Sequence, residues 1–286
     1  MITNTKKHIL DYNEKTDREA VNLFLTKTLR THSHLDWRKP IEWMQRSPTK
    51  FLYNDQEIQA ILSMPPDPFH MHWVRFFVVK HELPQSNAWH ELFSAILSEN
   101  AYDENDHITA LCYQNWMESM LVKEGWQKVQ KVIVLTWGGN GRKVSPVNTP
   151  VNIRRMQAVD LDQVIKIDNI CFQKYWKFSA ETITRAHASS AYATVAEIDG
   201  TVVGLLISTA DLQRAHLTRL AVLPEYRNQG IGSQLVENML RHFSVPWIRQ
   251  ITVNTQFNNH SSIHLYEKCG FEYRGESFPI YRYPTS

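Results

Sequence analysis

An apolar segment leads into a glycine-containing turn at residues 220–235, LAVLPEYRNQGIGSQL. The first residues predict a strand that ends at Val222, and the pattern after Gly230 predicts a helix. Gly230 and Gly232 carry no side chain that would keep an anion away from the backbone amides at the helix N-terminus. Arg227 can add positive charge at the same place. The turn is therefore a candidate pyrophosphate site.

Glycines in such a turn also serve other roles. Two glycines can also serve only chain reversal and close helix packing, because they are a weak signal by themselves. A dinucleotide fingerprint fits less well, since Gln234 and Leu235 stand where a third glycine or alanine belongs. A Walker loop is excluded, because no Gly-Lys-Ser/Thr follows either glycine cluster.

A second motif follows at Asn259-x-x-Ser262-x-x-Leu265-Tyr266-x-Lys268-x-Gly270-Phe271. Together with Arg227-x-x-Gly230-x-Gly232 it resembles the GNAT superfamily of N-acetyltransferases, over Val151 to about Tyr283. The resemblance implies a mixed, mostly antiparallel twisted sheet flanked by helices, an α/β (α+β) fold. Its fourth and fifth strands would splay apart and admit acetyl-coenzyme A.

The resemblance also implies the residues of the site. The amides from Arg227 to Ser233 would hold the pyrophosphate, and Leu220 and Val222 would pair their backbone with the pantetheine arm. Asn259 would hydrogen-bond that arm, and Ser262 departs from the usual alanine. The full cofactor-binding set is Leu220, Ala221, Val222, Arg227, Asn228, Gln229, Gly230, Ile231, Gly232, Ser233, Asn254, Asn259 and Tyr266.

Tyr266 is the expected catalytic residue. The resemblance places it beside the cofactor sulfur, and a phenol with a pKa of about 10 stays protonated at neutral pH and can donate a proton as the thiolate leaves. The alternative is a core aromatic that packs with Leu265 and Phe271.

The sequence defines the acceptor site and the general base less well than the cofactor site. The general base could be Glu197, His216, or a water held by strand carbonyls. Phe172, Tyr175 and Trp176 fall between two predicted helices, where the family lines its acceptor site; the alternative is a hydrophobic lid without selectivity.

Periodicity predicts the elements of the second half. Asp199-Gly200 is a two-residue hairpin signal, and Ser179 is a plausible helix N-cap. The predicted strands are 151–155, 192–198, 201–209, 216–222, 248–255 and 271–277, and the predicted helices are 158–170, 179–188, 230–243 and 261–268.

The two halves of the chain repeat at a nearly constant offset. Residues 53–62 match 197–206 and residues 73–79 match 217–223 at an offset of 144, while 121–126 match 266–271 at 145. The sequence therefore predicts two tandem domains, 1–137 and 151–286, joined by a glycine- and proline-containing linker at 138–150.

The first copy has lost the residues of the site. Ser86 and Ala88 replace Gly230 and Gly232, and Leu83 and Leu121 replace Arg227 and Tyr266. We expect a degenerate domain that serves packing or shapes the acceptor site. Six tryptophans of this half are expected in its core: Trp37, Trp43, Trp73, Trp89, Trp116 and Trp126.

Composition narrows the function class further. The 286 residues carry 31 basic and 29 acidic side chains, a formal net charge of +2 without basic runs, which gives no sign of nucleic acid or an anionic membrane as partner. Three scattered cysteines, the lack of an apolar run of about 20 residues and the polar start predict a cytoplasmic protein. His70-Met-His72 has no carboxylate near it in sequence, so no metal site is expected.

The expected activity is transfer of an acetyl group from acetyl-coenzyme A directly to a primary amine. The alternative is a non-catalytic acyl-coenzyme A binding or regulatory module in which Tyr266 only packs. An antibiotic, a polyamine, an amino acid and a protein N-terminus are all compatible acceptors, and the oligomeric state has no sequence signal.

Overall fold

The structure is a computed structural model of the chain that describes residues 7–27, 29–34, 36–138 and 151–284. Its contacts divide the chain into two units: Met1–Gln130 with Phe278–Ser286, and Lys131–Ser277. In the described part, no helix is both long and apolar enough to span a membrane.

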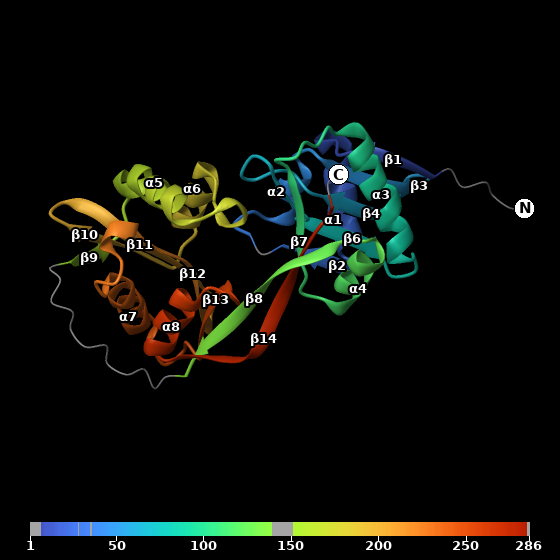
Figure 1. The fold of residues 1–286 in the computed structure, drawn as a ribbon. Coiled ribbons are helices and arrows are strands. Elements are labelled where there is room, and N and C mark those ends of the chain that lie inside the picture. The colour runs from blue at the N-terminus through green and yellow to red at the C-terminus, as the bar shows by residue number, and fades with distance from the viewer. Residues whose placement is uncertain (1–6, 28, 35, 139–150, 285–286) are drawn as a thin grey trace, which may run out of the picture. The chain divides into compact units, whose positions relative to one another are not determined.

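The second unit is a mixed sheet with helices on both faces. Its elements are β9 (Asn152–Arg155), α5 (Leu161–Cys171), α6 (Ala180–Ala188), β10 (Tyr192–Ile198), β11 (Thr201–Ala210), β12 (Arg214–Val222), α7 (Ile231–Phe243), β13 (Gln250–Gln256), α8 (His260–Lys268) and β14 (Phe271–Arg282). Strands β9 to β12 are antiparallel neighbours, and β12 and β13 are parallel. Figure 1 shows α5 and α6 on one face of this sheet and α7 and α8 on the other.

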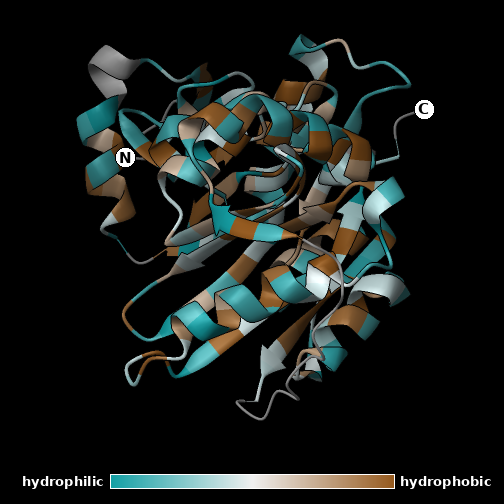
Figure 2. Ribbon diagram, turned by 90° about the vertical axis from the view of Figure 1, so that its left-hand side faces the viewer, coloured by the Kyte–Doolittle hydropathy of each residue, from teal (hydrophilic) through white to brown (hydrophobic). Residues whose placement is uncertain are grey.

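Local signals explain much of this unit. Asp199 and Gly200 have φ of 48° and 76°, the left-handed geometry that a tight two-residue hairpin turn requires. The Ser179 side chain accepts a hydrogen bond from the Thr182 amide at 3.1 Å and so caps α6, as predicted. On α7, Leu235 and Met239 are fully buried against the sheet. Figure 2 shows apolar stretches on the strands and alternating apolar and polar positions along the helices.

The first unit repeats this order with two differences: a strand, β2, lies between its first two helices, and two strands, β5 and β6, take the place of β12. It contains β1 (Lys7–Asp11), α1 (Glu14–Leu25), β2 (Leu29–Ser33), α2 (Pro40–Met44), β3 (Thr49–Asn54), β4 (Glu57–Ser63), β5 (Met71–Trp73), β6 (Phe76–Lys80), α3 (Gln85–Glu99), β7 (His107–Leu111), α4 (Asn115–Lys123) and β8 (Gln127–Trp137). One sheet has the order β1-β3-β4-β6-β2, and β5 pairs in parallel with β7.

The backbone repeats the duplication seen in the sequence. Asp55 has φ of 53° where Asp199 has 48°, an offset of 199 − 55 = 144. Gly125 has φ of 79° where Gly270 has 91°, an offset of 270 − 125 = 145. Left-handed conformations are uncommon at residues other than glycine, so the paired aspartates support a true structural repeat.

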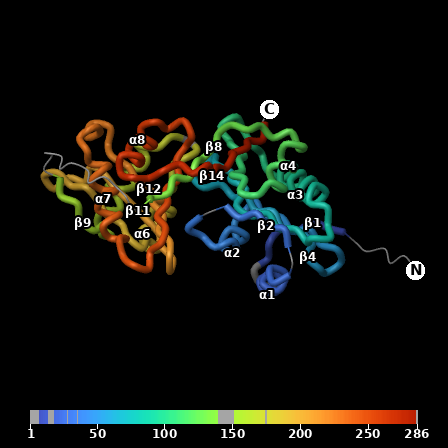
Figure 3. Tube along the Cα trace, turned by 90° about the horizontal axis from the view of Figure 1, so that it is seen from below, coloured from blue at the N-terminus to red at the C-terminus, as the bar shows by residue number. Residues whose placement is uncertain are grey.

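Strands β8 and β14 pass from one unit into the other (Figure 3). Residues 132–136 of β8 pair with β13 of the second unit, and residues 280–282 of β14 pair with β7 of the first. The contacts therefore divide the chain at 130/131 and 277/278, whereas the sequence placed the domains at 1–137 and 151–286. The last strand is also longer than expected, because alternation does not reveal where a strand changes neighbours. Apart from Gly138, the expected linker 138–150 lies outside the described residues.

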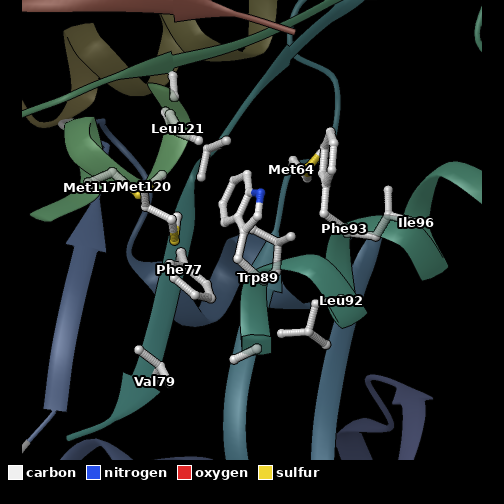
Figure 4. Packing of buried hydrophobic residues seen from close by; sticks show 14 of the residues in the cluster. Met64, Phe77, Val79, Trp89, Leu92, Phe93, Ile96, Met117, Met120 and Leu121 are labelled. Atoms are coloured by element: carbon white, nitrogen blue, oxygen red, sulfur yellow. The ribbon is translucent and has the colours of Figure 1, made fainter. Parts of the chain in front are cut away.

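Trp89 lies at the centre of the core of the first unit (Figure 4). Its ring meets Phe77 edge-on with centroids 5.2 Å apart and Trp126 at 5.8 Å. Trp43, Trp73, Trp89 and Trp126 are buried, which confirms their predicted role, while Trp37 and Trp116 are half-buried.

Candidate functional site

Strands β12 and β13 diverge partway along their length. Their parallel pairing runs from Arg214↔Gln250 to Leu217↔Val253, while β12 stays paired with β11 as far as Gly204↔Val222. The register with β11 shifts at the point where the strands part, so that Thr218 is an extra residue in β12. Such a bulge bends a strand and increases its twist. It explains the opening, and no described strand covers the edge of β12 from residue 218 to 222.

The backbone of Leu220 and Val222 faces this opening. The amide of Leu223 donates to the Val203 carbonyl of β11 at 2.9 Å, and alternate residues of a strand present their backbone groups to opposite edges. The Val222 carbonyl accepts hydrogen bonds from Arg227 Nε at 3.0 Å and from the Cys171 thiol at 3.3 Å. Sequence reasoning missed this role of Cys171.

The turn after β12 has the conformation of an anion-binding loop. Asn228 and Gly230 have φ of 62° and 78°, and α7 begins at Ile231. The first amides of a helix have no acceptor within the helix, so those of Ile231, Gly232 and Ser233 are available to a ligand. Gly230 is required here because its φ is positive.

Gly232 has a packing role as well. A Cβ atom at this position would lie 2.7 Å from Leu265 Cδ1 of α8. The glycine therefore lets α8 lie close to the first turn of α7. Close helix packing, which the sequence left as an alternative for these glycines, holds for Gly232.

Asn259 caps α8. Its side-chain oxygen accepts from the Ser262 amide at 3.2 Å, and its Nδ2 donates to Gln256 Oε1 at 3.1 Å. The amide carries two N–H groups, so contact with a cofactor arm stays a prediction that requires the second one. Asn254 lies on β13 directly after the last residue paired with β12.

Tyr266 of α8 is buried in the core of the second unit. It is 5% exposed and packs in one cluster with Leu217 and Ile231, and its ring lies 5.8 Å from that of Phe271 in an edge-on arrangement. Burial raises the pKa of the Tyr266 phenol above its ordinary value. The hydroxyl is therefore protonated across the physiological pH range.

The two side chains considered as general base differ in position. Glu197 of β10 is ion-paired with Arg154 of β9 at 2.8 Å, two strands away from β12. His216 of β12 is half-buried, and its Nδ1 lies 2.8 Å from Thr252 Oγ1 of β13. Burial lowers the pKa of His216 to about 4, so its imidazole is neutral and weakly basic at neutral pH.

A buried ion pair holds the segment between α5 and α6. Arg219 of β12 donates to Asp168 of α5 and to the Trp176 carbonyl, at 2.6 and 2.5 Å respectively. The guanidinium lies 3.3 Å from the centroid of the Phe172 ring. Phe172, Tyr175 and Trp176 are each half-buried on this segment. Sequence reasoning missed Arg219, although an arginine inside the apolar strand Leu217–Val222 signals a buried partner.

The first unit lacks these features at the matching positions. Ala88 lies inside α3 and is fully buried, as is Leu121 in α4, and both belong to the core around Trp89. Neither Ser86 nor Ala88 has the positive φ found at Gly230. The expected loss of the glycine turn is therefore visible in the backbone.

His70 is near carboxylates that are distant in sequence. Its Nδ1 lies 2.9 Å from Asp106 Oδ1, and His72 Nε2 lies 3.3 Å from the same oxygen. His70, Asp103 and Asp106 each offer a donor atom, and these three atoms lie within 4.8 Å of one another. These carboxylates are more than 30 residues from His70 in sequence, so the cluster has no local sequence signal, and Asp106 already accepts hydrogen bonds from both imidazoles.

Comparison with known proteins agrees with this geometry. The model of the family described as "Acetyltransferase (GNAT) family" matches residues 161–271. An N-alpha-acetyltransferase of Sulfurisphaera tokodaii is 27% identical over 135 residues, which cover 42% of this chain and 79% of that protein. A Bacillus subtilis protein with the provisional name ribosomal protein bS18-alanine N-acetyltransferase is 26% identical over 129 residues, or 44% and 83% of the two chains.

Solved structures resemble the whole chain. A tandem GNAT protein from the clavulanic acid biosynthesis pathway aligns with a TM-score of 0.65 at 13% identity, covering 98% of this chain and 100% of that one. A probable N-acyltransferase of Enterococcus faecalis aligns with a TM-score of 0.68 at 9% identity, covering 97% and 72%. At such low identity these matches show the fold alone, which is that of two tandem GNAT domains.

Proposed function

The chain belongs to the GNAT family of acetyl-coenzyme A-dependent N-acetyltransferases through its C-terminal half, and we propose that this half transfers the acetyl group directly to a primary amine. The observation that carries the proposal is the opening between β12 and β13, with a glycine turn at one end. An edge without a partner strand can pair with the amides of a pantetheine arm, and the helix N-terminus can hold its pyrophosphate.

The cofactor would lie along residues already described. In this proposal Leu220, Ala221 and Val222 bind the arm, and residues 227–233 bind the pyrophosphate. Asn254 and Asn259 lie beside the arm. The Val222 carbonyl would exchange its contacts with Arg227 and Cys171 for a cofactor amide, which frees the Arg227 side chain to approach a phosphate.

The reaction is one nucleophilic substitution at the thioester. The neutral amine forms a bond to the acetyl carbon, and the resulting tetrahedral intermediate collapses with cleavage of the carbon–sulfur bond. Tyr266 donates its phenolic proton to the departing thiolate, a step favoured by a hydroxyl that is protonated before the reaction. The amide product and free coenzyme A result.

The proton of the attacking nitrogen goes to water in this proposal. Neither side chain considered as general base is suited to accept this proton. Glu197 is ion-paired with Arg154, and His216, with a pKa of about 4, is too weak a base. A water at the open end of β12 is the remaining candidate. The proton then passes to solvent, and Tyr266 is reprotonated from the same source.

We propose the α-amino group of a peptide as the acceptor to test first, because the relatives named above carry that activity in their names. The segment with Tyr175 and Trp176 would contact the first side chains of that acceptor peptide. The experiment follows free thiol release from acetyl-coenzyme A with peptides that have free or formylated N-termini, with spermidine and with free amino acids. Release with free N-termini alone supports the proposal; release with none of these amines supports a binding module.

A further inference from the structure

Strand β6 of the first unit corresponds to the diverging part of β12. Strand β4 corresponds to β11 at the offset of 144, and Ala60 pairs with Val79 where Gly204 pairs with Val222. Val79 is therefore the counterpart of Val222, and Phe77 is the counterpart of Leu220. One edge of β6 pairs with β4, from Ala60↔Val79 to Ser63↔Phe76. The other edge of β6 is therefore the counterpart of the β12 edge that faces the opening in the second unit.

Strand β2 covers that edge. It pairs antiparallel with β6 along its full length, from Leu29↔Lys80 to Ser33↔Phe76. In the second unit, the pairing of β12 with β13 ends at Leu217, and the described residues place no strand beyond it. The same backbone edge is thus filled in one copy and open in the other.

The covering strand arises from a longer connection between the first two helices. Between α1 and α2 lie residues 26–39, which is 14 residues, whereas α5 and α6 are joined by residues 172–179, which is 8. The additional length supplies β2. The shorter connection carries Phe172, Tyr175 and Trp176 instead.

Buried polar contacts fix the end of β2 to the first unit. The His34 amide donates to the Arg75 carbonyl at 2.9 Å, and the Arg75 guanidinium donates to Asp36 at 2.7 Å. The side chains of Arg75 and Asp36 are only 5% and 7% exposed, and the guanidinium lies 4.3 Å from the Trp43 ring centroid. His32 is fully buried, with its Nε2 3.3 Å from the Val74 carbonyl.

We propose that β2 permanently occupies the edge on which an acyl-coenzyme A would bind in the first unit. A strand tethered to the same chain is present at a high effective concentration, so a free cofactor competes poorly with it. The loss of the two glycines removes the phosphate site independently. The first unit therefore binds no acyl-coenzyme A, because its own chain supplies the pairing that the pantetheine arm supplies in the second.

Hydrogen exchange on the full chain, read by mass spectrometry with and without acetyl-coenzyme A, tests this proposal. In the free protein we expect the amides of Phe77 and Val79, which face β2, to exchange at least about tenfold more slowly than those of Leu220 and Val222, which face the opening. Acetyl-coenzyme A should slow exchange at Leu220 and Val222 and leave it unchanged at Phe77 and Val79. Equal rates in the free protein, or slowing at Phe77 and Val79 on addition of the cofactor, would overturn the proposal.

This experiment tests the proposed cofactor site and the proposed role of β2 separately. If the amides of Leu220 and Val222 do not respond while those of Phe77 and Val79 stay protected, the proposed cofactor site is wrong and the role of β2 stands. An Arg30→Pro variant adds a second readout, because the Arg30 amide lies opposite Val79 and points towards β6, so that a proline there removes a hydrogen bond of the pairing. It should accelerate exchange at Phe77 and Val79 and leave Leu220 and Val222 unaffected; unchanged exchange at Phe77 and Val79 would show that β2 does not protect that edge.

Discussion

Arg219 and Asp168 form a two-point ion pair in the interior of the second unit. The guanidinium Nε and Nη2 lie 2.6 and 2.8 Å from the two carboxylate oxygens, and the side chains are 6% and 0% exposed. The pair joins β12, next to the proposed cofactor edge, to the helix α5 that precedes the segment with Phe172, Tyr175 and Trp176. Phe178 continues this link, because its amide donates to the same carboxylate at 3.2 Å.

We predict that Asp168→Asn lowers the free energy of unfolding by about 3 kcal/mol, because it leaves the buried guanidinium without its counter-charge. Urea unfolding of the full chain measures this. The matched control is Glu181→Gln, which removes the partner of Arg185 in an exposed ion pair and should cost less than about 0.5 kcal/mol. Equal losses in the two variants would contradict the prediction.

Gly232→Ala should destabilise the protein by about 1 kcal/mol or less, because its Cβ would meet the end of the half-buried Leu265 side chain at 2.7 Å while alanine has the higher helix propensity. Shortening the neighbour should relieve the clash. The Gly232→Ala/Leu265→Ala double variant is therefore expected to be more stable than the sum of the two single changes predicts. A double-mutant cycle of unfolding free energies measures the coupling, and strictly additive values would show that the two positions do not interact.

Tyr266→Phe should lower kcat by about a hundredfold and leave the affinity for acetyl-coenzyme A nearly unchanged. The substitution keeps the ring and its contact with Phe271 and removes only the proton donor, whose contribution exists in the transition state. Steady-state kinetics with an accepted amine and calorimetric titration of the cofactor measure the two quantities. A variant with wild-type kcat would show that solvent protonates the thiolate.

The stability of the second unit should fall in mild acid because of His216. Its pKa is about 4 in the folded protein against an ordinary value near 6.5, so the unfolded chain binds the extra proton between these values and stability is lost as pH falls from about 7 towards 4. Between pH 7 and pH 5 we expect wild type to lose about 1–2 kcal/mol more than His216→Gln. Urea unfolding at both pH values measures the difference, and identical losses would place the imidazole in contact with water.

Local chemistry predicted much of the second unit. The Asp199-Gly200 turn, the Ser179 cap and the start of α7 after Gly230 each follow from a residue type that favours one backbone conformation. The constant offset between the halves likewise predicted the repeated fold. These signals lie within a few residues of the features that they determine.

Long-range pairing could not be predicted in the same way. Nothing in the alternation of residues 127–137 indicates that the strand leaves one unit for the other, and the polar strand Leu29–Ser33 has no signal for a position against β6. Arg219 pairs with Asp168, which is 51 residues away in the sequence, and His70 contacts Asp106, which is 36 residues away. Such contacts depend on the assembled fold.

A substitution at Gly230 is the most specific test of the proposed cofactor site. Gly230→Val should weaken acetyl-coenzyme A binding by about tenfold or more, since it strains the turn and projects a branched side chain at the helix N-terminus. Gly200→Val is the matched control, because Gly200 has nearly the same φ, 76° against 78°, in a hairpin turn without an assigned ligand. The backbone strain of about 1–2 kcal/mol should be similar in the two variants. A loss of cofactor binding in Gly230→Val alone therefore identifies Gly230 as part of the cofactor site.

Calorimetric titration of acetyl-coenzyme A into the full chain tests the central claim most directly, because it counts the sites in both copies at once. We predict a stoichiometry of one per chain for the wild type and for Gly200→Val, and no measurable binding, or binding weakened by about tenfold or more, for Gly230→Val. A stoichiometry of two, or wild-type affinity in a folded Gly230→Val variant, would contradict an enzyme with a single cofactor site in its C-terminal half.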